Sequence, residues 1–238
     1  GWQRQEMGIP SIQQEIEWAI EKFCQRQCNV HAAGRTDAGV HAAGQVAHFD
    51  LDYGDRPLTG YDITKALNAY LVKHQIAIIS AEPVSQDFHA RHSARDKLYT
   101  YRLLNRVAPP TYDRNLVWHW RRDLDVDAML EGAQHLLGYH DFSTFRALKC
   151  QAKSPFKTLD RLDIEVVNLP HGGRELRFLL GSRSFLHHQV RNMVGTLMLV
   201  GDKKWSSDDV KTALEARDRT KGGPTAPPDG LSLTAVYY

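Results

Sequence analysis

The stretch RLDIEVVNLPHGGRELRFLLG, residues 161–181, decides the fold class of this chain. Apolar residues occupy alternate positions in two runs, at Leu162, Ile164 and Val166 and again at Leu176, Phe178 and Leu180. A period of two is typical of a β-strand that buries one face. Because His171-Gly172-Gly173 lies between the runs and favours a turn, the stretch predicts an antiparallel hairpin.

The residues after this hairpin change to helical spacing. Over 185–200 the apolar positions recur every three or four residues, and Gly201 is expected to end the helix. More helices are predicted after Ser11, over 63–71, from the N-cap Asp125 to about 137, and after 206–207. Strands are predicted at 29–33, 45–50, 76–82, 98–105, 117–120, 158–168, 175–181 and 231–237. This mixed order indicates an α+β fold with a mixed, mostly antiparallel sheet.

Strands and helices alternate twice along the chain, once before residue 106 and once after it. The repetition predicts two similar halves of the βαβ type, residues 1–106 and 107–238, that share one sheet. Pro109-Pro110 lies at the junction. The Gly- and Pro-rich segment 221–230 is expected to be a mobile loop that leads into the last strand.

The composition is that of an ordinary globular protein, with 42% hydrophobic and 24% charged residues in 238. It excludes a disordered or collagen-like chain, and no apolar run approaches the roughly 20 residues that span a bilayer. An odd number of cysteines (Cys24, Cys28 and Cys150) and no signal peptide favour a reducing compartment, the cytoplasm.

The net charge of +2 is almost neutral, but its distribution is uneven. Residues 88–106 carry five Lys and Arg against one acid, residues 146–161 also carry five against one, and no acid lies between Glu175 and Asp202. One interpretation is that the three basic stretches converge into a surface for an anionic ligand. The alternative is that each is a solvated face.

The most unusual segment is GRTDAGVH, residues 34–41, between two predicted strands. Its glycines permit backbone conformations closed to other residues and a close approach of a ligand. Small neighbours expose Asp37 in this expected hairpin bend, with the cation of Arg35 two residues away. A carboxylate so placed can serve as the nucleophile of a group transfer. The alternative is an Asx-type turn that only shapes a hairpin.

Two other segments carry candidate binding residues. Alternation over 97–102 puts Tyr99 on one strand face, where an aromatic ring beside basic residues suits stacking on a nucleobase. The alternative is a core tyrosine with a satisfied hydroxyl. In the helix predicted over 185–200, His187, His188 and Arg191 occupy the less apolar face near its start. An arginine buried there needs a carboxylate, which makes Arg191 a candidate partner for Asp37.

Metal signals in the sequence are incomplete. Cys24, Cys28 and His31 lack a fourth ligand for zinc. The acids in 123–127 resemble the start of a calcium loop, but Ala128 stands where that loop needs glycine. The sequence contains no phosphate-binding loop and no dinucleotide fingerprint. We therefore expect neither a metal nor a cofactor.

The segment 34–41, followed by Gly44-Gln45-Val46, closely resembles the catalytic signature of the TruA-type tRNA pseudouridine synthases. Further blocks resemble family motifs in the expected order, at 1–5, 87–91, 142–146 and 187–195. The resemblance covers essentially the whole chain. It departs from the family in the first half, where the strand that precedes block 1–5 is missing.

The resemblance implies an isomerase that converts uridine to pseudouridine at positions 38–40 of the tRNA anticodon stem-loop, as a cytoplasmic homodimer without metal or cofactor. It implies two ferredoxin-like halves with helices on one face of a shared sheet and a central RNA-binding cleft. By the same resemblance, Asp37 is the nucleophile, Arg35 helps to flip the target base, Tyr99 stacks on the flipped uracil, and Arg191 pairs with Asp37. Two segments are implied to contact tRNA: Phe88, His89, Ala90, Arg91 and His92, and Lys149, Cys150, Gln151, Ala152 and Lys153.

Two other functions are compatible with the residues alone. One is a non-catalytic RNA-binding module with basic strands and aromatic side chains. An acid at the centre of an RNA groove is unfavourable unless it reacts, which argues against this reading. The other is a metal-dependent nuclease, for which no second carboxylate lies near Asp37 in the sequence.

Overall fold

The computed structural model describes residues 1–5, 8–51 and 58–238, which form two compact units. Unit 1 comprises Gly1–Ala38 and Gln45–Ala94, and unit 2 comprises Gly39–Gly44 and Arg95–Tyr238. The chain therefore passes between the units at residues 38/39, 44/45 and 94/95. The two units are defined by their compactness and not by a repeated order of strands and helices. The two similar halves that meet at residue 106 therefore stay a prediction.

Unit 1 contains two helices, α1 (Ile12–Cys24) and α2 (Gly60–Leu71), and a two-stranded antiparallel sheet of β1 (His31–Ala32) and β3 (Ala47–His48). Both helices were predicted, and each begins at a polar cap: Ser11 accepts from the Gln14 amide, and Thr59 forms a capping box with Asp62. The two helices pack around one apolar core, made of Trp2, Ile16, Ala19, Ile20, Val30, Leu67 and Leu71.

The strand predicted at 76–82 is not formed. The Asn68 side chain on α2 binds both backbone groups of Ile78, donating to its carbonyl at 2.7 Å and accepting from its amide at 2.8 Å. A side chain thus satisfies polar groups that a neighbouring strand would otherwise pair. The apolar pattern that suggested a strand reflects Ile76 and Ile78, which pack against the unit 1 core.

Unit 2 is built on a six-stranded sheet of β2 (His41–Ala42), β4 (Asp96–Asn105), β5 (Trp118–Trp120), β8 (Arg161–Asn168), β9 (Arg174–Ser182) and β10 (Leu231–Tyr237). The order is β2-β10-β4-β9-β8, with β5 paired to β4. The β2–β10 and β4–β5 pairs are parallel and the others are antiparallel, so the α+β class with a mixed, mostly antiparallel sheet is confirmed.

The hairpin predicted from residues 161–181 is formed by β8 and β9. Its apolar residues face each other in register, Leu162 with Leu180, Ile164 with Phe178, and Val166 with Leu176. Gly172 and Gly173 have φ of 87° and 80°, a left-handed conformation that glycine adopts without strain.

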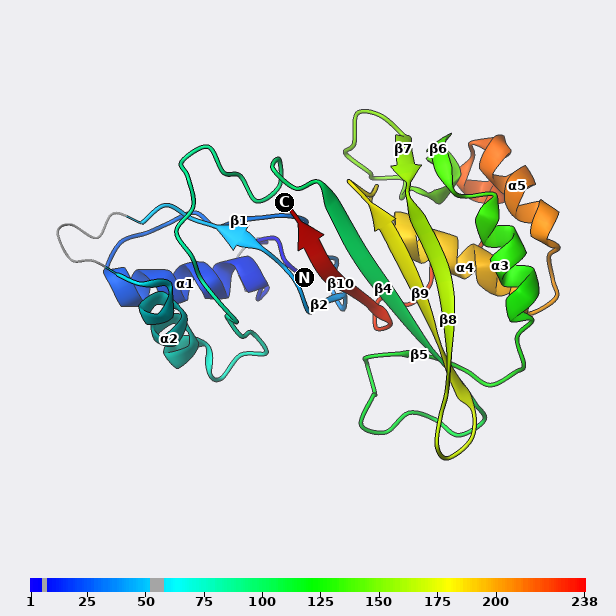
Figure 1. Cartoon of the computed structure of the whole chain (residues 1–238), viewed down its shortest axis with the longest axis horizontal. Helices are drawn as coiled ribbons and strands as arrows, with labels where there is room; N and C mark the ends of the chain where they lie inside the picture. The colour runs from blue at the N-terminus through cyan, green and yellow to red at the C-terminus, as the bar shows by residue number, and fades with distance from the viewer. Residues whose placement is uncertain (6–7, 52–57) are drawn as a thin grey trace. The chain divides into compact units, whose positions relative to one another are not determined.

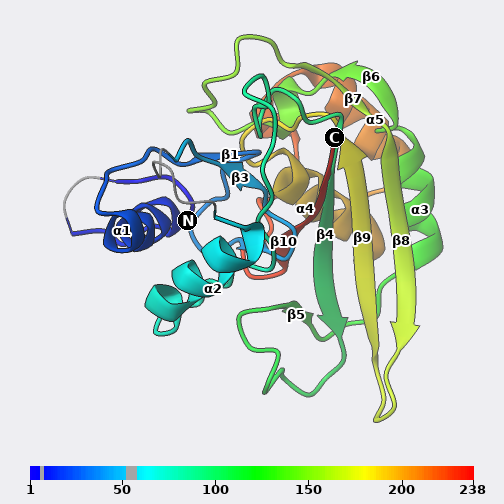
Figure 2. The same cartoon turned by 60° about the vertical axis from the view of Figure 1, so that its left-hand side comes forward.

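Three helices cover one face of the unit 2 sheet: α3 (Val126–Gln134), α4 (Gln189–Gly201) and α5 (Ser207–Ala216) (Figures 1 and 2). Short 3₁₀ turns, η1 (Ser143–Phe145) and η2 (Arg219–Lys221), and a separate hairpin of β6 (Gly138–Asp141) and β7 (Phe156–Leu159) complete the unit. Alternate residues of β4 and β9 are fully buried beneath the helices, including Tyr101, Leu103 and Phe178. Among the described helices, none has both the length and the apolar character needed to cross a bilayer.

Two predicted boundaries were wrong. The helix predicted from 185 begins at Gln189, because His188 adopts a left-handed φ of 64° and the Gln189 side chain accepts from the Leu186 amide at 2.8 Å. His187 and His188 therefore precede α4 and do not lie on its first turn. The single strand predicted at 158–168 is divided at Asp160 into β7 and β8, which belong to different sheets.

Candidate active site

The loop that carries Asp37 connects the two units. We expected it to lie in a hairpin, and this expectation is confirmed: β1 and β3, on either side of the loop, pair antiparallel, while β2 within the loop pairs with β10. The chain leaves unit 1 directly after Asp37 and Ala38, pairs with the last strand of unit 2, and returns at Gln45. The loop thus connects the two strands of the β1–β3 hairpin and, through β2, also adds a strand to the unit 2 sheet.

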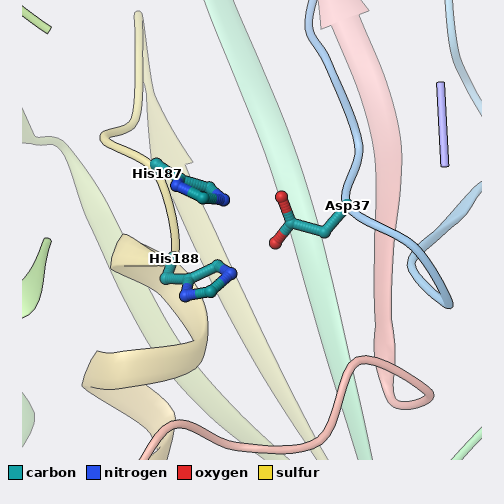
Figure 3. A group of neighbouring side chains, drawn as sticks. All are labelled: Asp37, His187 and His188. Carbon is teal, nitrogen blue, oxygen red and sulfur yellow. The ribbon is translucent and has the colours of Figure 1, made fainter. Parts of the chain in front are cut away.

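The backbone of this loop is held on several sides. The Trp2 amide donates to Thr36 O at 3.0 Å, and the Gln45 side-chain amide donates to Gly34 O at 2.8 Å. A Cβ added to Gly1 would lie 2.9 Å from both Thr36 O and Ala38 N, so the chain around Gly1 packs tightly against the loop. Asp37 is half-buried and Arg35 is exposed. Figure 3 shows the Asp37 side chain projecting from the loop.

Tyr99 lies on the helix-covered face of β4. Its side chain is 9% exposed, and its ring meets the Phe185 ring edge-on at 5.2 Å between centroids. Leu180 and Leu233 are its partners on the neighbouring strands. The burial matches the core-tyrosine alternative, and the contact with Phe185 places the ring beside the segment that leads into α4.

Arg191 lies in the first turn of α4 and is half-buried. Its Nε donates to Ala226 O at 2.8 Å, and the Ala226 amide donates back to Arg191 O at 3.1 Å. The Tyr101 hydroxyl donates to the next carbonyl, Pro227 O, at 2.8 Å. Burial raises the pKa of Tyr101, and the nearby Arg191 charge partly opposes that shift. Arg191 is therefore fixed beside Tyr101, two positions from Tyr99 on the same strand face.

The Gly- and Pro-rich segment 221–230 is docked on α4 rather than loosely connected. Thr196 Oγ1 accepts from the Gly223 amide at 2.9 Å, and Asn192 Oδ1 accepts from Thr225 at 2.7 Å. A Cβ on Gly195 would lie 1.8 Å from Pro224 O, which leaves room only for glycine. The segment thus forms a rigid support for the Arg191 side chain.

The segment 88–92 forms a turn that packs on β1 and β3 of unit 1. His89 Nδ1 accepts from the amides of Arg91 and His92 at 3.1 and 3.4 Å, and His48 Nδ1 accepts from the Ala90 amide at 3.2 Å. Ala90 is buried, while Arg91 and His92 are exposed. This arrangement presents a cation on a turn whose backbone is fixed by imidazole acceptors.

Four imidazole rings meet at this turn. Centroid distances are 5.2 Å for His31–His48, 4.6 Å for His48–His89 and 4.3 Å for His89–His92. The sequence alone does not predict that His31 and His48 belong to this cluster. The two residues become direct cross-strand neighbours only when β1 and β3 pair.

This histidine cluster predicts a pH-dependent stability. The pKa of His89 is lowered, first by burial and then by His92, His48 and His31. An unfolded histidine titrates near 6.5, so the unfolded chain takes up protons more readily and the free energy of unfolding falls as the pH drops below about 7. In thermal unfolding between pH 7.5 and 5, we expect His89→Asn to lose Tm less steeply than the parent, because asparagine keeps an acceptor and does not titrate. His171→Asn, in the β8–β9 turn, should keep the parental slope; equal slopes for all three proteins would contradict the prediction.

The segment 149–153 lies in the connection between β6 and β7. Lys149, Gln151 and Lys153 are exposed, whereas Cys150 and Ala152 are half-buried against the unit 2 core. The Ala147 amide donates to His187 O at 2.9 Å, which ties this connection to the residue pair before α4. The rings of that pair, His187 and His188, lie 4.1 Å apart (Figure 3).

Two arginines of the basic stretches bind one carboxylate on the open face of the sheet. Arg102 binds the buried Glu175 through two nitrogens at 2.7 and 3.0 Å, and Arg177 binds the same carboxylate at 2.6 Å. Burial opposes ionisation of Glu175, but these hydrogen bonds outweigh it and hold its pKa below the usual range. Arg102 and Arg177 therefore stabilise the sheet. The exposed cations of segments 88–92 and 149–153 are better placed to bind an anionic ligand.

Comparison with known proteins identifies the family of this chain. A family model described as tRNA pseudouridine synthase matches residues 2–93 and 133–238. The tRNA pseudouridine synthase A of Paramagnetospirillum magneticum is 56% identical over 238 residues, covering all of this chain and 90% of that protein. Proteins of the same name are 52% identical in Rhodospirillum rubrum, covering 100% of this chain and 82% of that protein, and 50% identical in Caulobacter vibrioides, covering 97% and 90%. Since both kinds of match extend over most of the chain, it belongs to the tRNA pseudouridine synthase family and is an isomerase that acts on tRNA.

Proposed function

We propose that this enzyme converts uridine to pseudouridine at positions 38–40 of the tRNA anticodon stem-loop, with Asp37 as the nucleophile. The observation that carries the proposal is the half-buried Asp37, held in a hydrogen-bonded loop within the matched family residues. A fixed backbone lets a short side chain meet a substrate without further ordering.

The reaction breaks the bond between N1 of uracil and C1′ of the ribose and forms a bond between C5 and C1′. The hydrogen on C5 leaves as a proton and N1 takes up a proton, so the product is an isomer and no oxidant or reductant is consumed. An ionised carboxylate suits the first step because it can attack either C1′ or C6 of the ring. The base must leave its stack beforehand, which costs a few kcal/mol.

The other site residues offset that cost and support the charge. Arg35 is exposed on the Asp37 loop, as a residue that inserts into the stack must be. Tyr99 stacks on the flipped uracil, and Arg191 pairs with the Asp37 carboxylate in the working enzyme. The hydrogen bond from Arg191 to Ala226 O aligns its guanidinium in advance.

The exposed cations at 88–92 and 149–153 hold the tRNA phosphates. We further propose that the enzyme works as a homodimer in the cytoplasm, needs no metal or cofactor, and consists of ferredoxin-like halves that line a central RNA-binding cleft. The match to a family model described as tRNA pseudouridine synthase supports the proposal that the ligand is tRNA. It also favours an enzyme over the non-catalytic RNA-binding module and the nuclease.

The stacking role of Tyr99 predicts a contrast between two substitutions. Tyr99→Phe keeps the ring and should retain most of the pseudouridine formation, whereas Tyr99→Leu should lose about 1–3 kcal/mol of transition-state stabilisation. The assay is tritium release from tRNA that contains [5-³H]uridine. Leu103→Met, a buried residue on the same strand face, controls for repacking of the core. Equal rates for the Phe and Leu variants would remove the stacking role.

A further inference from the structure

An exposed pair of aromatic side chains lies on the β6–β7 hairpin of unit 2. The rings of Tyr139 and Phe156 are stacked, with centroids 5.6 Å apart and planes inclined by 21°. Tyr139 is 68% exposed and Phe156 is 41% exposed. Two large rings that stack on each other in solvent bury little area, so the fold gains little from them.

The strand register explains why these rings face outward. Tyr139 is opposite Thr158, and Phe156 is opposite Asp141, so the two rings are diagonal neighbours on one face of the hairpin. The other face carries Leu159, which is fully buried. The hairpin is thus anchored to the core by one face, and it presents the aromatic pair on the other.

The surroundings of the pair are basic. The connection between β6 and β7, residues 142–155, contains Arg146, Lys149 and Lys153 and no acid. The Phe142 amide donates to Pro155 O at 3.1 Å, so the connection that bears these cations begins at the end of the hairpin next to Phe156. One acid, Asp141, lies directly opposite Phe156 on the same face, and Arg217 lies 3.9 Å from its carboxylate.

This connection is also fixed to the start of α4. Asn192 donates to Phe145 O at 2.8 Å, and the Ala147 amide donates to His187 O. The aromatic pair, the basic connection and the turn that carries Arg191 therefore form one rigid region of unit 2. A ligand bound at the pair would be held at a constant position relative to Arg191.

We propose that Tyr139 and Phe156 form a stacking platform for an unpaired nucleobase of the tRNA, other than the target uridine, while the neighbouring lysines bind the flanking phosphates. The inference rests on the proposed function and names a second contact for the same substrate. Flat rings beside cations match the requirements of single-stranded nucleic acid. A second copy of this chain fits the surface less well, because a twofold interface centred on the pair would bring two sets of like charges close together.

The test compares Tyr139→Leu/Phe156→Leu with the conservative double variant Tyr139→Phe/Phe156→Tyr. We expect the leucine variant to raise the Kd for a tRNA transcript roughly tenfold or more in fluorescence anisotropy at fixed salt, with kcat at saturating tRNA unchanged. The conservative variant should bind like the parent, and Tyr112→Leu, at an exposed tyrosine of the same unit, should do so too.

Three outcomes would overturn the inference: an unchanged Kd, a loss of kcat without a loss of affinity, or a change in sedimentation that shows the pair to be a subunit contact. Failure of the proposed function is distinguishable from all three. In that case the parent protein itself would form no pseudouridine in tRNA, whatever residues stand at 139 and 156.

Discussion

Replacing Asp37 by asparagine is expected to lower the rate of pseudouridine formation by about 10⁴-fold or more, because the amide is nearly isosteric but is not a nucleophile. The loop should keep its shape, since Trp2 and Gln45 hold its backbone at Thr36 and Gly34. Tritium release under single-turnover conditions measures the chemical step. The tRNA Kd should change little, because Asp37 acts on the base after binding.

The matched control is Asp50→Asn, which removes an exposed carboxylate from the same unit. It should release tritium at the parental rate and unfold at the parental Tm. A rate for Asp37→Asn within tenfold of the parent would assign the nucleophile to another group.

The second large effect is expected from Arg191→Ala, which should lower kcat by about 100-fold and leave the Kd for tRNA nearly unchanged. A cation beside the reacting carboxylate stabilises the transition state, in which charge moves, more than it stabilises the bound substrate. Arg191 suits this role because its Nε is already held by Ala226 O and the loop 221–230 is docked on α4. Steady-state kinetics measures kcat, and a separate binding assay measures the Kd for tRNA.

Arg191→Lys sharpens this prediction, because lysine keeps the charge but cannot match the guanidinium geometry. We expect it to fall between the parent and the alanine variant. Arg183→Ala removes an exposed cation of the same unit and should leave kcat unchanged. A loss confined to tRNA affinity in Arg191→Ala would show that the arginine binds phosphate and does not support Asp37.

Local patterns predicted the elements whose partners lie nearby in the chain. The β8–β9 hairpin follows from alternation and a Gly-Gly turn, and the starts of α1 and α3 follow from the caps Ser11 and Asp125. The start of α4 was misplaced because Leu186 and Phe185 continue the apolar pattern, while the left-handed His188 interrupts the helix. Apolar periodicity alone does not report such a backbone conformation.

The pairing of strands that are far apart in the chain could not be predicted from the sequence. The segment 34–41 stands between strands that form the predicted hairpin, but the pairing of β2 with β10, nearly 200 residues later in the chain, was not predicted. Nothing local predicts this second pairing, because a two-residue strand carries too little pattern. The chemistry of the segment was readable because it depends on residue types, namely one acid among glycines and small side chains.

Charge runs were only partly informative. They located the exposed cations at 88–92 and 149–153, but they also included Arg102 and Arg177, which both bind Glu175. Arg102 lies on β4 and Glu175 on the neighbouring strand β9, so a count along the chain misses this pairing. The histidine cluster was missed for the same reason, since His31, His48 and His89 meet only after folding.

The most direct test of the account is to map pseudouridine in tRNA from a strain that lacks this gene and carries either the parent gene or its Asp37→Asn variant. The account predicts that the parent gene restores pseudouridine at positions 38–40 and at no other position, and that the variant restores none, although both proteins accumulate equally. Restoration by the variant, or modification outside the anticodon stem-loop, would contradict it.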